Sequence, residues 1–323
     1  MGNIITMSIV QSALELGCIY ALVAMALFIS FTILDIADLS TDGCFTLGCA
    51  VCATVTIMGH PILGLFAAML AGVVSGFVTA FLQTKLGIQS ILAGIIVNTG
   101  LYTINIAVMG FSSNLNLFGC TTIFTWGKES FGSSWSQLVL ALVIVLVVGL
   151  LISLFLNTRL GLSIRATGDN PDMVRASSIN TKLMITIGLC VANAMTGLSG
   201  GLLAQYQRSC DINLGTGMVT IALASLIIGE SLIGKGSMFT RILGVILGSC
   251  LYRFIVAVAL RLNVPAEALK LVSSIIVAIA IALPYLKKQF AFYKAKRIAK
   301  EENEAYIQEI TAQEQNSRKG EME

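Results

Sequence analysis

Long apolar runs separated by short polar connections make up most of this chain. Nine runs have about the length that a helix needs to cross the hydrocarbon core of a bilayer, roughly 20 residues. They lie at about 9–31, 43–59, 61–82, 88–109, 136–156, 183–205, 217–233, 242–262 and 268–286. The pattern predicts an all-α, polytopic membrane protein with eight to ten transmembrane helices.

The composition agrees with this prediction. Of the 323 residues, 56% are hydrophobic and 11% are charged, and the mean hydropathy is +0.88. A soluble domain carries roughly a quarter charged residues. A water-soluble fold is therefore excluded.

The connections differ in their content of Lys and Arg, which is highest on the cytoplasmic side of membrane proteins. The basic connections, predicted to be cytoplasmic, are 157–182, 234–241 and a C-terminal tail, 287–323, that is first basic and then acidic. The nearly balanced connections, predicted to lie outside, are 110–135, 206–216 and about 261–267. We expect the basic part of the tail at the lipid headgroups, and we do not expect it to bind nucleic acid.

Residues 36–43, IADLSTDG, are too polar for a helix that faces lipid. Irregular backbone at membrane depth is tolerated only where it is buried in protein or lines a water-filled cavity. If 35–59 is one simple crossing, nine crossings place the N-terminus outside. If it is a broken or re-entrant pair of short helices, the N-terminus is inside, and the sequence leaves both possibilities open.

A short motif, G-x-x-T-x-x-x-A, occurs twice, at residues 43–50 and 217–224. Each copy follows an Asp-Ile pair, at Asp35 and at Asp211. Transporters often consist of two related halves with interrupted helices at matching positions around the substrate path. The motif predicts two such halves here, although chance matching in an apolar sequence is the alternative.

Several polar side chains interrupt the apolar runs. A charge that faces lipid costs at least a few kcal/mol, so these groups should face the bundle interior or an aqueous path. Interhelical hydrogen bonding is the alternative explanation for each of them. The candidates for a substrate path are Glu15 (with Gln11 one turn earlier), Asp38, Ser40, Asp42, Asn98, Asn193 and Arg253. Glu230, near the cytoplasmic end of its run, is predicted to have a structural or gating role.

The cysteines and the single histidine give little sign of a metal site or an enzyme. Cys49 and Cys52 form a C-x-x-C pair, but neither a second pair nor a nearby His accompanies it. A metal or redox site normally needs such a further ligand set. His60, beside Pro61, is predicted to be a loop residue, and we expect no metal.

The longest predicted cytoplasmic connection, 157–182, reads NTRLGLSIRATGDNPDMVRASSINTK. Gly168-Asp169-Asn170-Pro171 predicts a turn and a helix start, because Pro suits the first helical position. Residues 171–178 would then form a short surface helix that a partner can grip. The chain has no G-x-x-x-x-G-K-[ST] phosphate loop, so we expect ATP to be bound elsewhere.

This connection resembles the coupling-helix signature of binding-protein-dependent ABC permeases of the branched-chain amino acid and ribose type. The family pattern is approximately G-x-x-x-R-A-x-G-x-N-x-x-x-A-x-x-x-G-I-N, and this chain departs from it at Val174, where the pattern has Ala, and at Ser178, where Gly is usual. Two other regions are similar: Asp38-Leu-Ser40 resembles the family's broken second helix, and Tyr252-Arg253, Leu269-Lys270-Leu and Leu283-Pro284 resemble a sub-branch linked to tryptophan or tyrosine uptake. The resemblance covers residues 10–286.

The resemblance implies a transmembrane permease domain at 1–286 that catalyses no covalent reaction. The implied partners are a cytoplasmic ATP-binding subunit that holds ATP and Mg²⁺, a periplasmic or lipid-anchored solute-binding protein, and a second copy of the permease. The implied location is the bacterial inner membrane, with the C-terminus in the cytoplasm. The implied contacts with the ATPase are Arg165, Gly168, Asn170, Pro171 and Arg175.

Two other classes of function stay open at this stage. An ion-coupled secondary transporter would use acids such as Glu15 or Asp42 and would need no partner at 165–180. An intramembrane enzyme would need facing catalytic residues at membrane depth, whereas Asp38 and Asp42 lie close together in sequence. An amino acid suits the acidic and amide groups somewhat better than an anion, and a sugar or nucleoside is the alternative solute.

Overall fold

The computed structural model describes residues 7–132, 135–234 and 236–261, together with short stretches between 271 and 303. The chain divides into two compact units, Met1–Val277 and Ala278–Glu323. The described residues of the second unit, such as 292–297, are helical. Most of the predicted span 268–286 and most of the tail 287–323 lie outside the described residues.

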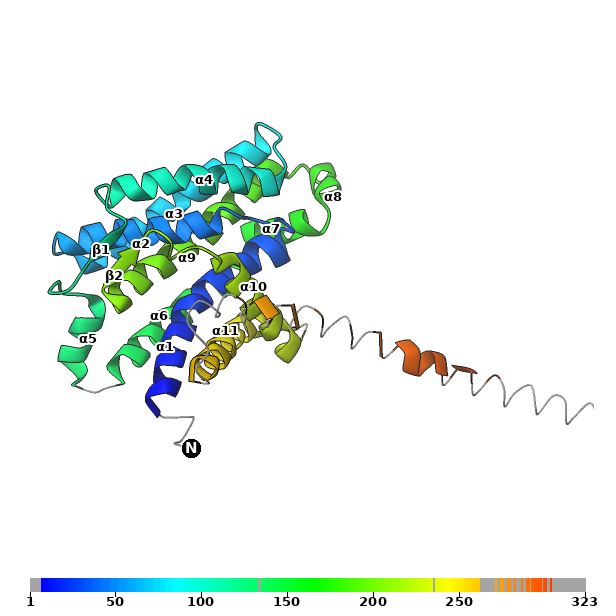
Figure 1. Cartoon of the computed structure of the whole chain (residues 1–323). Coiled ribbons are helices and arrows are strands. Elements are labelled where there is room, and N and C mark those ends of the chain that lie inside the picture. Colours follow the sequence, from blue (N-terminus) through cyan, green and yellow to red (C-terminus); the bar gives the residue numbers. More distant parts are fainter. Residues whose placement is uncertain are drawn as a thin grey trace, which may run out of the picture. The chain divides into compact units, whose positions relative to one another are not determined.

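The first unit is a helical bundle (Figure 1), and its helices follow the predicted apolar runs closely. Six helices are long and apolar enough to cross a membrane: α1 (Met7–Leu27, extended by the π-helix Phe28–Ile33), α3 (Pro61–Thr84), α4 (Ser90–Val108), α6 (Ser136–Asn157), α9 (Thr181–Gln207) and α11 (Met238–Arg261). Two shorter apolar helices are α2 (Thr41–Ile57) and α10 (Met218–Ile233). The prediction of a polytopic all-α membrane protein is confirmed.

Four elements in the connections were not predicted from the sequence. They are β1 (Asn114–Asn116), α5 (Ile123–Phe131), α7 (Arg159–Asp169) and β2 (Ser209–Asp211). The strands β1 and β2 pair antiparallel, with Leu115 opposite Cys210. Both are three residues long, which is too short for an alternating sequence pattern to reveal them.

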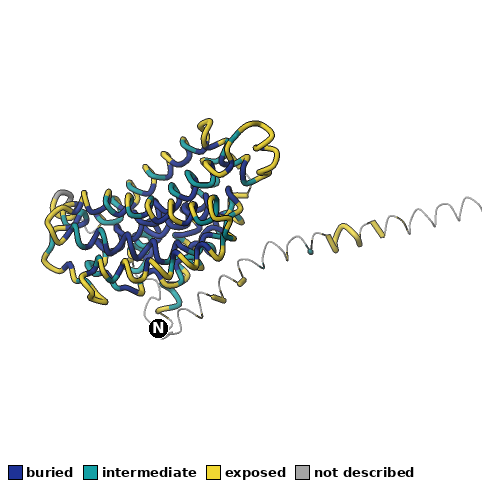
Figure 2. Tube along the Cα trace, turned by 90° about the horizontal axis from the view of Figure 1, so that it is seen from above, coloured by how far each residue is buried: buried dark blue, intermediate teal, exposed yellow. Residues whose placement is uncertain are grey.

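Helix α9 runs through the centre of the unit, and close backbone contacts hold its neighbours against it. A Cβ on Gly200 would overlap the carbonyl oxygen of Phe45 on α2, and one on Gly72 of α3 would overlap that of Asn193. Small residues permit such close helix packing in membranes. Gly197 of α9 makes the same kind of contact, because a Cβ there would overlap the carbonyl oxygen of Ala68 on α3. Figure 2 shows the buried positions gathered inside the bundle and the exposed positions around it.

Contacts with α9 also fix the direction of the first two helices. Ser199 donates to the carbonyl of Ile19, whereas Gly188 packs against Leu34, so α1 runs antiparallel to α9. Cys44 donates to Asn193 O and Cys49 to Gly200 O, so α2 runs parallel to α9. Helices α1 and α2 thus run in opposite directions, and residues 41–57 form one helix rather than a pair.

The two ends of the bundle carry different elements (Figure 1). We call the end with α7 and α8 (Pro171–Ala176) the α8 face, and the end with β1, β2 and α5 the opposite face. The C-terminal end of α1 reaches the α8 face, because a Cβ on Gly168 of α7 would overlap the carbonyl oxygen of Ile33. The N-terminal end of α1 therefore lies at the opposite face.

Candidate functional site

The chain leaves helical geometry between α1 and α2, at residues 34–40. Helix α1 ends in a π-helical turn, and Asp35 follows with a positive φ of 56°. Asp is among the few residues other than Gly that adopt this conformation readily. The predicted break at 36–43 is confirmed as far as residue 40. Asp42, which we had placed in the break, lies in the first turn of α2.

Three of the predicted path residues form one buried hydrogen-bond network at this break. Asp38 Oδ1 accepts from Ser40 N at 2.9 Å and from Ser40 Oγ at 2.6 Å, while its Oδ2 accepts from Asn193 Nδ2 of α9 at 2.8 Å. Asp38, Ser40 and Asn193 are each at most 3% exposed. The network joins the break to the centre of α9. These three residues therefore make the hydrogen bonds between segments that were the alternative to a role in a substrate path.

Asp42 lies beside the start of α10. Its Oδ2 accepts from Gly217 N and its Oδ1 from Val219 N, both at 2.9 Å. A carboxylate at a helix N-terminus satisfies N–H groups that have no partner within the helix, and it complements the helix dipole. The two copies of the predicted repeat therefore begin the two short helices, and the N-termini of α2 and α10 meet at Asp42.

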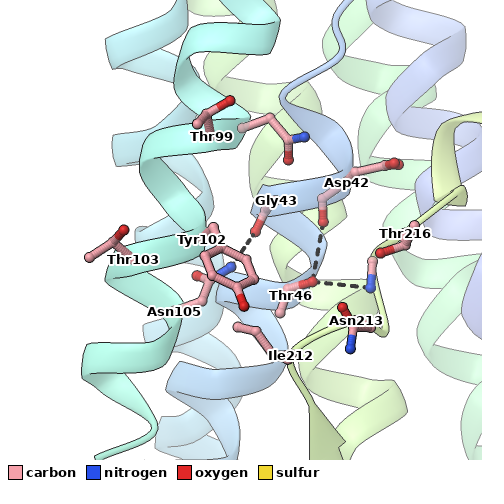
Figure 3. Close-up of a pocket in the computed structure, with 12 residues that line it drawn as sticks. Asp42, Gly43, Thr46, Thr99, Tyr102, Thr103, Asn105, Ile212, Asn213 and Thr216 are labelled. Atoms are coloured by element: carbon pink, nitrogen blue, oxygen red, sulfur yellow. Dashed lines mark hydrogen bonds between the residues drawn. The ribbon is translucent and has the colours of Figure 1, made fainter. Parts of the chain in front are cut away.

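A cavity of about 450 Å³ opens at this meeting point, between α2, α4 and the segment that leads into α10. We call it the α4 cavity (Figure 3). Its walls are mostly amides and hydroxyls. The lining residues are Asp42, Gly43, Thr46, Asn98, Thr99, Tyr102, Thr103, Asn105, Ile212, Asn213, Gly215 and Thr216.

Two hydrogen bonds of α2 shape the inner wall of the α4 cavity. Thr46 Oγ accepts from Gly215 N at 3.0 Å, and Asn105 Nδ2 donates to the carbonyl of Gly43 at 3.1 Å. Asn105 is 2% exposed, and its Oδ1 has no hydrogen-bond partner. The amide of Asn105 is therefore fixed on one side and free on the other.

Of the predicted path residues, only Asp42 and Asn98 line the α4 cavity. Sequence reasoning missed Tyr102 and Asn105, although a signal was present. Positions 98, 102 and 105 are separated by four and three residues, so they share one face of α4. A polar stripe at helical spacing in an apolar run would have identified all three.

Glu15 and Arg253 lie elsewhere, on α1 and α11. Glu15 accepts from Gln11 Nε2 at 2.9 Å, as its spacing from Gln11 suggested, and from the Tyr206 hydroxyl at 2.7 Å. The Arg253 guanidinium lies 3.5 Å from the centre of the Tyr20 ring, where a cation–π attraction holds it. Arg253 also borders a separate cavity of about 390 Å³. Neither residue reaches the α4 cavity.

Near the α8 face, Glu230 of α10 pairs with Arg241 of α11 at 2.8 Å. The Arg241 guanidinium also lies 4.8 Å from the centre of the Phe28 ring, at the π-helical end of α1. Arg241 thus connects α10, α11 and α1 at one point. The structural role predicted for Glu230 agrees with this position.

The predicted surface helix in 157–182 is present as α8, but it is shorter than predicted and ends at Ala176. Asn170 accepts from the N–H groups of Asp172 and Met173, both at 3.1 Å, and Pro171 takes the first helical position. Gly168 and Asp169 still belong to α7, so the predicted turn at 168–171 is reduced to Asn170. Its Asx-type cap is what separates the two helices.

The remaining coupling candidates differ in exposure. Arg165 of α7 is half-buried, whereas Arg175 of α8 is exposed and pairs with exposed Asp172 at 3.3 Å. Ser178 has a positive φ of 62°, a conformation that favours Gly. The chain departs from the coupling signature at this position, and Ser keeps the backbone conformation that Gly would adopt there.

The cysteines serve packing and hydrogen bonding. Cys49 donates to the carbonyl of Gly200, and Cys52 accepts from Gln205 Nε2. His60 directly precedes α3, as predicted for a loop residue. Among the residues that the structure describes, no group of three or more His, Cys, Asp or Glu is placed to hold a metal ion.

The fold is a multi-pass helical bundle with a polar cavity beside the short helices α2 and α10 and a short capped helix exposed at one face. Residues 9–282 match the family described as "Branched-chain amino acid transport system / permease component". The chain belongs to this family.

Individual relatives agree with the family match. The chain is 33% identical over 295 residues to the tyrosine transport system permease protein of Clostridioides difficile (strain R20291), covering 91% of this chain and 97% of that protein. It is 25% identical over 261 residues to the ribose import permease protein RbsC of Escherichia coli (strain K12), covering 78% of each. A nucleoside ABC transporter permease protein, NupB of Lactococcus lactis subsp. cremoris (strain MG1363), is 26% identical over 184 residues, 51% of this chain and 50% of that protein. No solved structure matches the chain.

Proposed function

We propose that this chain is the membrane-spanning subunit of an ATP-binding-cassette importer that moves a small polar solute, most favourably an amino acid. A separate subunit, which binds ATP and Mg²⁺, would dock at the α8 face in the cytoplasm of a bacterium. An extracytoplasmic binding protein would deliver the solute to the opposite face. Two permease subunits would together form the pathway in the inner membrane.

The observation that carries this proposal is the way α8 is presented. Five of the six α8 residues are exposed, and Val174 alone is buried. The Asn170 cap and Pro171 fix where the helix begins. A short helix that is held in place yet contributes little to the core is suited to docking a partner protein.

A force on α8 has a direct route into the membrane. Only Asn170 separates the end of α7 from the start of α8. Gly168, near the end of α7, packs against the backbone of Ile33. Ile33 is the last residue of the π-helical turn, and the non-helical segment 34–40 follows it. Movement of the ATPase would therefore reach the break before α2 through one rigid contact.

The preference for an amino acid rests on the closer of the reported relatives. The tyrosine permease shares 33% identity with this chain, and the ribose permease shares 25%. A nucleoside permease is also among the relatives, so the family as a whole serves several solute classes. A sugar or a nucleoside is accordingly the alternative solute.

The proposal is tested by reconstituting the chain in proteoliposomes, with and without a candidate ATPase subunit and a candidate binding protein. We expect uptake of a radiolabelled amino acid only when both partners and ATP are present. Uptake driven by a proton or sodium gradient through the chain alone would instead identify a secondary transporter.

A further inference from the structure

We propose that a groove between α3 and α4 is a lipid site, which holds one acyl chain of an anionic phospholipid and places its headgroup beside Lys85. The site lies in the leaflet on the side of the α8 face. The inference does not depend on the proposed import function, because it concerns how the bundle meets the membrane around it.

The groove is a cavity of about 480 Å³ between α3 and α4, with Leu47 of α2 also among its lining residues. We call it the α3–α4 groove. Of its eleven described lining residues, only Ser75 has a polar side chain. Val74 of α3 and Ile104 of α4 are both exposed, so the groove opens at the surface of the bundle. Because α3 and α4 are long and apolar enough to cross a membrane, the medium outside this surface is lipid hydrocarbon.

The contacts of α3 with α9 show which end of the groove lies at which face. Gly76 of α3 packs against Leu189, and Gly72 packs against Asn193, so α3 runs antiparallel to α9. Helix α9 begins shortly after α8. The C-terminal end of α3 and the start of α4 therefore lie at the α8 face.

The groove has the depth of about one leaflet. Its lining residues on α3 run from Ala71 to Leu82, which corresponds to about 16 Å at 1.5 Å per residue. The hydrocarbon core of a bilayer is roughly 30 Å thick, so the groove covers about half of it. The Leu82 end lies near the headgroups at the α8 face, and the Ala71 end lies near the middle of the bilayer.

An acyl chain is the occupant that satisfies the walls of the groove. Apolar atoms without neighbours lose their dispersion contacts, and an apolar cavity does not hold ordered water. A Cβ built at Gly100, in the α4 wall, would meet nothing within 4 Å. A hydrocarbon chain lying along the groove supplies the missing contacts over its whole length.

The two sides of α4 differ in the groups that they present. Ile96, Gly100 and Ile104 recur every four residues along the groove, whereas Asn98 and Tyr102 line the polar α4 cavity. The described α4 residues on the groove side carry no polar side chain. A polar solute therefore fits the α4 cavity, and a hydrocarbon chain fits the groove.

Lys85 gives the site a preference for a charged headgroup. It follows Leu82 by three residues, so it continues the groove side of α3 by about one turn at the headgroup end. Lys85 is exposed and forms no ion pair with another described residue. An anionic headgroup, such as that of phosphatidylglycerol, supplies the opposite charge.

Photolabelling of the full chain in nanodiscs tests the site without ATP or partner subunits. The probe is phosphatidylglycerol with a diazirine at the end of one acyl chain, as a minor component in phosphatidylcholine, and peptide mass spectrometry locates the label. We expect label at Ala71 and Ile104 at least about fivefold above that at Val147 and Leu151, which are exposed apolar residues of α6. The same diazirine carried on phosphatidylcholine should label the groove about fivefold less, because it lacks the net charge that Lys85 attracts.

Variants assign the label to the groove and the preference to Lys85. Gly100→Phe places a ring in the groove and should remove the label at Ala71, and Val74→Phe, at an exposed lining position, serves if Gly100→Phe does not fold. Lys85→Gln should keep the label but abolish the preference for phosphatidylglycerol. Lys182→Gln, which removes an exposed lysine at the start of α9, is the matched control and should change neither.

Three outcomes overturn the inference. Equal labelling of the groove and of α6 would show contact with bulk lipid only, and equal labelling by the two headgroups would remove the role of Lys85. Absence of label at Ala71 would exclude the acyl chain. In that case, a disulfide between two chains of a Val74→Cys variant, which the unchanged protein does not form, would identify a second permease copy as the occupant. None of these outcomes bears on ATP-driven uptake, which is measured separately.

Discussion

The carboxylate of Asp42, in the first turn of α2, accepts a hydrogen bond from the backbone N–H of Gly217, at the start of α10, at 2.9 Å. A second bond, from Val219 N, engages the other carboxylate oxygen. Residues 175 positions apart in the chain are thus joined as cap and helix. The contact joins the N-terminal ends of the two short helices, α2 and α10, where the two copies of the sequence repeat lie.

Loss of this cap should destabilise the bundle. We expect Asp42→Ala to lower the free energy of unfolding by about 1–2 kcal/mol, since both N–H groups lose their acceptor. Asp42→Asn keeps one acceptor oxygen and should lose about half as much. Thermal unfolding in detergent measures both, with Glu129→Ala, an exposed carboxylate on α5, as the control. An unchanged midpoint for Asp42→Ala would contradict the capping role.

The contact between Gly168 and Ile33 should be sensitive to a single methyl group. A Cβ at Gly168 would overlap the Ile33 carbonyl oxygen, so Gly168→Ala must move α7 away from the end of α1. Overpacking of this kind costs about 1–3 kcal/mol. In the reconstituted importer we expect ATP hydrolysis to continue while uptake per ATP falls.

Gly100→Ala is the control for that experiment, because nothing lies within 4 Å of a Cβ built at Gly100. It should leave uptake unchanged. If Gly168→Ala transports at the full rate, the route from α8 through α7 to the break before α2 is wrong.

The exposed face of α8 should matter for ATPase docking and little for stability. Arg175 and Asp172 form an exposed ion pair, which contributes about 0–1 kcal/mol. We expect Arg175→Glu to leave the unfolding midpoint nearly unchanged and to weaken co-purification of the ATPase. Met173→Cys, 70% exposed, should form a cross-link to the ATPase. Retention of the ATPase by Arg175→Glu, with no cross-link from Met173→Cys, would argue against docking at α8.

The buried pair Asp38 and Asn193 should show energetic coupling. Removing one partner leaves Asp38 Oδ2, or one N–H of the Asn193 amide, buried without its partner, at a cost of about 1–3 kcal/mol. In a double-mutant cycle with Asp38→Ala and Asn193→Ala, we expect the double variant to lose clearly less than the sum of the single losses. Additive losses would show that the 2.8 Å contact does not contribute to stability. The bond from Ser199 to Ile19 O, removed by Ser199→Ala, is the uncoupled control.

The sequence was most informative where a feature is local. Apolar runs gave the eight apolar helices of the first unit to within a few residues, because burial in lipid or protein demands apolar side chains along a whole span. Asn170 and Pro171 similarly predicted where α8 begins. Helix α7 was missed, since its apolar positions are few and its packing partner, Ile33, is more than a hundred residues away.

For the polar residues, the sequence determined which groups cannot face lipid, and the tertiary structure decided what each of them faces. Asp38, Asp42 and Asn193 were all predicted path residues, the two acids in the polar break and the amide within an apolar run. Only the placement of α9 and α10 turned Asp38 and Asn193 into a buried pair and Asp42 into a helix cap. Asn105, not singled out from the sequence, is held against α2 because its amide nitrogen donates to Gly43 O. The physical reason is that the need of a buried polar group for a hydrogen-bond partner follows from its own chemistry, whereas the partner is a residue that folding brings from a distant part of the chain.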